Sequence, residues 1–262
     1  RQRHLTIPCE MCIRDSRRAM SRPPVRFPIG LSSFRSLREG GFTYVDKTAL
    51  IEDVLAEGAQ VLLVPRPRRF GKTLNLSMLR CFFEKGDDDL RPLFDGLAIT
   101  SCESAWAHFQ RYPVIFMTFK DVKPRSWEDC LEGVAGVVAR AYAEHRDLLT
   151  QGALEPDEVE LFTAILHRRA PKAWLADALR LLSRLLARHH RQEVVILIDE
   201  YDSPIHAGYT NRYYDDVITF FRDFLSGGLK DNPHLFKGVL TGILRVARES
   251  LFSGLNNISV YS

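Results

Sequence analysis

Short runs of consecutive apolar residues, far apart in the chain, most strongly limit the folds open to this sequence. They lie within residues 60–64, 114–119 and 194–198, and none of these segments alternates regularly between apolar and polar residues. A strand without polar alternation is usually covered on both faces, as in a parallel sheet. Because helical apolar periodicity fills the intervening sequence, we predict an α/β fold with a mainly parallel central sheet and helices on both faces.

The remaining elements follow from periodicity and from turn residues. Asp46 is expected to cap the first long helix, and Gly227-Gly228 to end the helix that begins at residue 213. Phe42–Val45 is short and β-prone. Two further strands are predicted at 237–242 and 258–261. Helices are predicted at 47–57, 73–84, 127–145, 155–169, 172–190 and 213–225.

The residues after the first apolar run end in Gly71-Lys72-Thr73. This ending matches the second half of the phosphate-binding loop G-x-x-x-x-G-K-[ST], the Walker A motif. Gly71 lets the backbone approach an anion, and Lys72 brings positive charge to the β- and γ-phosphates. Thr73 offers a hydroxyl to Mg²⁺ in the first turn of a helix, where free N–H groups also favour anions.

One position of the loop departs from the motif. Arg66 stands five residues before Gly71, where the first glycine is expected, so the loop is predicted to curl less freely. Arg68 and Arg69 add further positive charge. A basic turn between a strand and a helix explains these residues without any ligand, so the loop alone leaves both interpretations open.

Two acids, Asp199 and Glu200, follow the apolar run at 194–198. A carboxylate there lies at the C-terminal edge of the sheet, where ligands of open α/β sheets bind. Asp199 is predicted to hold Mg²⁺, directly or through water, and Glu200 to activate a water for attack on the γ-phosphate, as in a Walker B motif. An isolated acid of this kind is more often a turn residue, and the upstream Gly-Lys-Thr is what favours a nucleotide site. Strand 114–119 separates the two motifs in sequence, as in NTPases with an added strand between the motifs in the sheet.

Residues further along the chain complete the predicted site. Thr241, at the end of the strand 237–242, is a candidate sensor of the γ-phosphate, and Arg245 is a candidate catalytic arginine finger, with Arg248 as a second choice. Such an arginine contacts the nucleotide of its own subunit or that of a neighbouring subunit, so an oligomer is one option. A surface position without any role at the nucleotide explains Arg245 and Arg248 equally well. The residues predicted to contact nucleotide are Arg68, Arg69, Phe70, Gly71, Lys72, Thr73, Leu74 and Thr241.

Composition excludes several other classes of protein. The chain has 262 residues and a net charge of +3, which is too small to indicate nucleic acid by itself. It contains no apolar run long enough for a membrane span and no secretory signal. Five cysteines, an odd number, favour free thiols in a reducing cytoplasm, and the single Cys9/Cys12 pair does not make a zinc site. Residues 1–24 are expected to be a disordered leader that need not be native coding sequence, ahead of one domain at 25–262.

Several segments together resemble the bacterial and archaeal AAA-ATPase-like family. They are Phe27–Gly30, Tyr44–Thr48, Arg66–Met78, Leu197–Asp202, Leu240–Ile243 and Ser253–Asn257. The resemblance implies a three-layer P-loop NTPase fold of the AAA/STAND type, binding of ATP and Mg²⁺, and an arginine-rich loop as a family trait. Family members usually continue into a PD-(D/E)xK nuclease-like domain, which is absent here, so we expect the chain to be truncated at its C-terminus.

Three functional hypotheses follow. The first is a Mg²⁺-dependent ATP hydrolase that drives or gates a C-terminal effector. The second, suggested by the missing first glycine, is a nucleotide-binding switch with negligible hydrolysis. The third is a nucleic-acid-binding module that uses Arg66, Arg68 and Arg69. The first two require the side chains of Lys72 and Asp199 to meet at one rim of the sheet.

Overall fold

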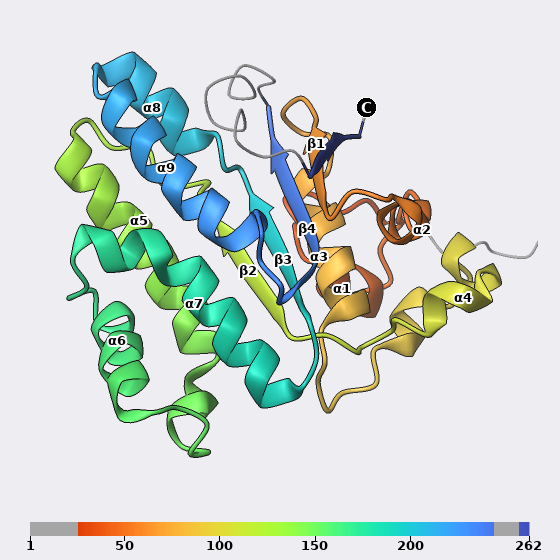
Figure 1. Ribbon diagram of the computed structural model, residues 1–262. Helices are drawn as coiled ribbons and strands as arrows, with labels where there is room; N and C mark the ends of the chain where they lie inside the picture. Colours follow the sequence, from red (N-terminus) through yellow and green to blue (C-terminus); the bar gives the residue numbers. More distant parts are fainter. Residues whose placement is uncertain (1–25, 244–256, 262) are drawn as a thin grey trace, which may run out of the picture.

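A five-stranded parallel sheet forms the centre of the molecule (Figure 1). The structure is a computed structural model that describes residues 26–243 and 257–261; the predicted leader lies outside them. The strand order is β2-β3-β4-β1-β5. The strands are β1 (Val61–Pro65), β2 (Val114–Thr118), β3 (Val194–Asp199), β4 (Leu235–Gly242) and β5 (Ile258–Val260).

Helices cover both faces of this sheet, which confirms the predicted α/β architecture (Figure 1). One face carries α1 (Phe34–Glu39), α2 (Ala49–Ala56), α3 (Lys72–Phe83) and α4 (Glu103–Trp106). The other carries α5 (Trp127–Glu144), α6 (Pro156–Leu166), α7 (Lys172–His190), α8 (Ser203–Asn211) and α9 (Tyr214–Leu229). Successive strand residues alternate between the two cores: Leu62 packs with the first set of helices, and Leu63 with the second.

The sheet order places the two predicted motifs close together. β4 lies between β1 and β3, because it pairs with β1 from Val61↔Gly238 onward and with β3 on its other side. Strand β2, which separates the motifs in sequence, lies at the edge of the sheet and pairs with β3. Only one strand therefore separates the loop after β1 from the acids that follow β3.

The prediction that Gly227-Gly228 ends a helix was wrong. Helix α9 continues through both glycines to Leu229. A Cβ at position 228 would lie 2.3 Å from Cγ of Leu179 on α7, so a side chain there would clash. The glycine therefore permits close packing of α7 against α9. The sequence alone suggested that the glycine pair ends the helix because it does not show that Leu179 packs against it.

The segment before α2 also differs from prediction. Phe42–Val45 forms no strand, and the helix begins at Ala49. The Asp46 carboxylate instead accepts hydrogen bonds from the backbone N–H groups of Thr48 (2.8 Å) and Ala98 (2.7 Å). Asp46 therefore joins this turn to the segment before α4 and does not act as the helix cap.

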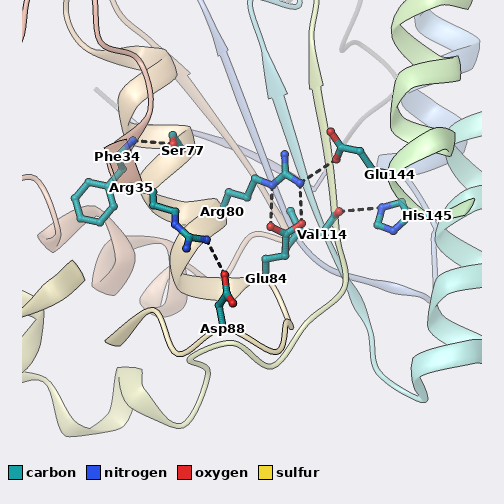
Figure 2. A network of polar contacts seen from close by, with 9 residues as sticks. All are labelled: Phe34, Arg35, Ser77, Arg80, Glu84, Asp88, Val114, Glu144 and His145. Atoms are coloured by element: carbon teal, nitrogen blue, oxygen red, sulfur yellow. Dashed lines mark hydrogen bonds and ion pairs between the residues drawn. The ribbon is translucent and has the colours of Figure 1, made fainter. Parts of the chain in front are cut away.

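Helix α3 is held from both sides by polar contacts (Figure 2). The Phe34 N–H at the start of α1 donates to Ser77 Oγ at 2.9 Å. On the opposite side, the Arg80 guanidinium bonds Glu84, the residue that follows α3, and Glu144 of α5, each at 2.9 Å. These contacts fix the helix whose N-terminus faces the C-terminal edge of the sheet. None of the helices in the described residues is both long and apolar enough to cross a membrane.

Candidate functional site

The loop from Arg66 to Thr73, named here the 66–73 loop, does not need a glycine at its first position. Arg66 continues the parallel ladder, since its N–H donates to Gly242 O at 3.0 Å. The positive φ angles occur later, at Arg69 (68°) and Gly71 (73°). Gly71 is also the N-cap of α3 and has no side chain to accept from the first-turn N–H groups. Arg66 in place of the first glycine therefore causes no positive-φ strain in this loop.

The Lys72 side chain is enclosed by the loop that precedes it. Its Nζ donates to the carbonyl oxygens of Arg66 at 3.0 Å and Pro67 at 3.1 Å, and the residue is only 7% exposed. An ammonium has three N–H donors. Two of them bond these carbonyls and so hold the loop around the charge.

The Asp199 carboxylate accepts hydrogen bonds from threonine hydroxyl groups on three different elements. Thr73 of α3 donates to Oδ2 at 2.8 Å, Thr241 of β4 donates to Oδ1 at 2.7 Å, and Thr118 of β2 lies 3.3 Å from Oδ2. Asp199 itself is fully buried. Thr73 and Asp199 lie 126 residues apart in sequence, and their contact brings the two predicted motifs together.

A large cleft opens over these residues. Its volume is about 1190 Å³, and it is bordered by residues 28–32, the 66–73 loop with the start of α3, the turn after β2, and Glu200 with α8. Of the predicted site residues, those in its wall are Arg68, Arg69, Gly71, Lys72, Thr73, Leu74 and Glu200.

Three predicted residues that the structure describes, Phe70, Thr241 and Asp199, are not in the cleft wall. Phe70 is 66% exposed and is not in the cleft wall. Thr241, the candidate phosphate sensor, is 2% exposed and directs its hydroxyl to Asp199, behind the wall. Arg245, like Arg248, falls outside the described residues.

Glu200 occupies an unusual backbone conformation at the edge of the cleft. Its φ is 49°, in the left-handed region that residues other than glycine seldom adopt and that is frequent at functional sites. Its Oε2 accepts a hydrogen bond from Ser203 Oγ at 3.1 Å. Nearby, the Asp202 carboxylate accepts from the Ile243 N–H at 2.7 Å, which fixes the end of β4. The Glu200 carboxylate is thus oriented at the surface of the cleft.

Positive charge predominates in the cleft wall. Five cationic side chains face two carboxylates, Glu200 and Asp202, and no cation of the five forms a salt bridge with a described residue. The five are Arg68, Arg69, Lys72, Lys120 and Lys123. Sequence reasoning missed Lys120, Lys123 and Thr118. The available signal was their position at the end of an apolar strand, which is the ligand edge of such sheets.

The donor set suits a magnesium ion bound together with a phosphate ligand. Among the described residues there is no group of three or more His, Cys, Asp or Glu side chains that encloses a cation. Magnesium is commonly held by one or two carboxylates together with phosphates and waters. The paired Thr73 hydroxyl and Asp199 carboxylate supply oxygen ligands of the required kind.

Comparison with known proteins agrees with this fold. The family model described as "Predicted AAA-ATPase" matches residues 28–252. An "Uncharacterized protein in vnfD 5'region" of Azotobacter chroococcum mcd 1 is 29% identical over 238 residues, which are 89% of this chain and 40% of that relative. The chain thus spans well under half the length of this relative. No solved structure gives a significant match. By the extent of the family match, the chain belongs to the AAA-ATPase-like family of predicted AAA-ATPases.

Proposed function

We propose that this domain binds ATP together with Mg²⁺ and hydrolyses its terminal phosphoanhydride bond. The observation that carries the proposal is the 2.8 Å contact between the Thr73 hydroxyl and the Asp199 carboxylate, beside the enclosed Lys72 ammonium. Membership of the family supports nucleotide binding in general. The assignment of individual residues below is our inference from their positions.

Binding of the phosphates rests on the 66–73 loop and the start of α3. Lys72 lies in the cleft wall and has one N–H beyond the two that bond the loop carbonyls, and the first-turn N–H groups of α3 add partial positive charge there. Arg68 and Arg69 lie in the same wall. This arrangement favours a polyphosphate over a neutral ligand.

Thr73 and Asp199 would hold the magnesium ion through their side-chain oxygens. When bound, the ion neutralises negative charge on the phosphate oxygens. Thr241 and Thr118 keep the carboxylate of Asp199 in a fixed orientation, because they hydrogen-bond it from the neighbouring strands.

Glu200 is the proposed general base. Its carboxylate lies at the cleft surface and is oriented by Ser203. It accepts a proton from a water whose oxygen bonds to the γ-phosphorus while the bond from that phosphorus to the leaving ADP oxygen breaks. Arg245 remains a proposed source of additional positive charge.

Two variants separate binding from turnover. Lys72→Ala should abolish detectable ATP binding, because it removes the charge at the centre of the loop. Glu200→Gln should keep binding but lower phosphate release about 100-fold or more, because it keeps the shape and loses the base. Lys85→Ala is the matched control, since Lys85 is exposed and follows the opposite end of α3.

Each variant can contradict its assignment. Wild-type affinity in Lys72→Ala would refute the phosphate site. Unchanged turnover in Glu200→Gln, with binding intact, would remove Glu200 from the role of base. Tight binding by the wild-type protein without any phosphate release would favour the nucleotide-binding switch instead.

The nucleic-acid alternative has less support from the geometry. The Arg66 guanidinium lies 5.7 Å from the centre of the Tyr261 ring and does not line the cleft, unlike Arg68 and Arg69. This alternative would gain support if the logarithm of the DNA affinity fell linearly with the logarithm of the salt concentration, with a slope that indicates several phosphate contacts. Coupling to a C-terminal effector, nuclease-like or otherwise, also remains a proposal.

A further inference from the structure

We propose that Lys120 contacts the terminal phosphate of the bound nucleotide and so distinguishes ATP from ADP. This inference rests on the ATP binding proposed above. It concerns the turn that follows β2, which neither the loop motif nor the acid motif includes.

Strand pairing brings Lys120 near the proposed water-activating residue, Glu200, and both line the cleft. Thr118 of β2 is opposite Asp199 of β3, and the next N–H, of Phe119, donates to Asp199 O at 2.9 Å. Continued by one residue, this register sets Phe119 opposite Glu200, so Lys120 lies one position beyond Glu200 on the adjacent strand; the strand spacing is about 5 Å. The terminal phosphate must lie near Glu200 if that residue activates the attacking water.

A second contact ties the Lys120 backbone to the metal site. The Lys120 N–H donates to Thr118 Oγ1 at 3.4 Å, and the same hydroxyl lies 3.3 Å from Asp199 Oδ2. The Thr118 hydroxyl thus connects the start of this turn to the carboxylate that we propose as a magnesium ligand.

The Lys120 side chain carries a charge that the described residues do not neutralise. It lies in the cleft wall, is exposed, and forms no salt bridge with a described residue, not even with the neighbouring Glu200. Arg80 and Arg188, by contrast, are paired with carboxylates. An unpaired ammonium at the edge of a phosphate site is placed to bind an anion.

Lys123 provides a matched comparison within the same turn. It also lines the cleft. The adjacent Pro124 carbonyl accepts from Asn211 Nδ2 at 3.3 Å and Tyr213 Oη at 2.9 Å, which anchors this part of the turn at the far end of α8. Helix α8 starts beside Glu200 and spans nine residues, about 13 Å at 1.5 Å per residue, so the segment around Lys123 is anchored at the end of α8 away from Glu200.

The test is calorimetric titration of the full 262-residue chain with ATP and with ADP, in the presence of Mg²⁺. Lys120→Ala should lower ATP affinity about tenfold while ADP affinity changes less than about twofold, as expected for loss of one charge-assisted hydrogen bond. Lys120→Arg should retain most of the ATP affinity. Lys123→Ala should change both affinities less than about threefold.

Two outcomes would overturn the inference and leave the proposed function standing. One is an unchanged ratio of ATP to ADP affinity in Lys120→Ala. The other is an equal loss in Lys120→Ala and Lys123→Ala, which would show only a diffuse effect of positive charge. If the wild-type protein binds neither nucleotide, the proposed function fails and the inference fails with it.

Discussion

Replacing Thr241 by valine is expected to destabilise the folded protein and to weaken metal binding at Asp199. The Thr241 hydroxyl donates to Asp199 Oδ1 at 2.7 Å, and the two residues are 2% and 0% exposed. Valine has nearly the same volume and shape, so the principal change is the loss of this one hydrogen bond.

The magnitude follows from burial and charge. A hydrogen bond to a charged group contributes about 1.5–3 kcal/mol, and the buried position leaves little water to replace it. We therefore expect the free energy of unfolding to fall by about 1.5–3 kcal/mol in Thr241→Val. Thr118→Val should cost less, because the Thr118 contact is longer, at 3.3 Å, and this residue is only half-buried.

Urea unfolding of the wild-type protein and the two valine variants measures these changes. Thr241→Ser serves as the control, since it keeps the hydroxyl and loses a methyl group worth about 1 kcal/mol. The Mg²⁺ concentration needed for half-maximal ATP binding provides a second measurement, and it should rise in Thr241→Val but not in Thr241→Ser. A valine variant as stable as wild type, with an unchanged Mg²⁺ requirement, would refute the role assigned to Thr241.

Two further predictions test packing and pH dependence. Gly228→Ala should destabilise the protein by about 1–3 kcal/mol through overpacking, because its Cβ would lie 2.3 Å from Leu179 Cγ. Gly227→Ala should be neutral or stabilising, because the nearest atom to its Cβ is 3.8 Å away. Equal effects of the two variants in thermal unfolding would contradict this account of the α7–α9 packing. Burial, together with nearby positive charge, lowers the pKa of His190 to about 4, and burial also lowers the pKa of His145, whose ring contacts the Val114 carbonyl (Figure 2). The unfolded state then binds more protons than the folded state between pH 6.5 and about 4, so stability should fall on acidification through this range. His190→Gln should flatten this decrease in urea unfolding, and an unchanged pH slope would show that His190 does not cause it.

Much of the framework could be predicted from the sequence because it depends on local pattern. The unbroken apolar runs that became β1, β2 and β3 indicated doubly covered parallel strands. Parallel strands place their C-terminal ends at one edge, so Lys72 and Asp199 were expected to meet there; the observed contact joins Asp199 to Thr73, the residue after Lys72.

The failures came from interactions between distant elements. Gly228 is explained by Leu179, 49 positions earlier, which no local pattern can indicate. Helix α8 was missed because Pro204 and Gly208 break its local helical signal, although Pro204 lies in the tolerated first turn. Thr118 and Lys120 acquire their positions from the pairing of β2 with β3, and that register is visible only in the folded sheet.

The most direct test of the central claim is the Mg²⁺ dependence of ATP binding in Asp199→Asn. The account predicts that wild-type protein binds ATP more tightly with Mg²⁺ than with EDTA, and that Asp199→Asn loses this increase while keeping the EDTA-level affinity supplied by Lys72. If Asp199→Asn retains the full Mg²⁺-dependent increase, the ion is not held at this carboxylate and the proposed site is contradicted.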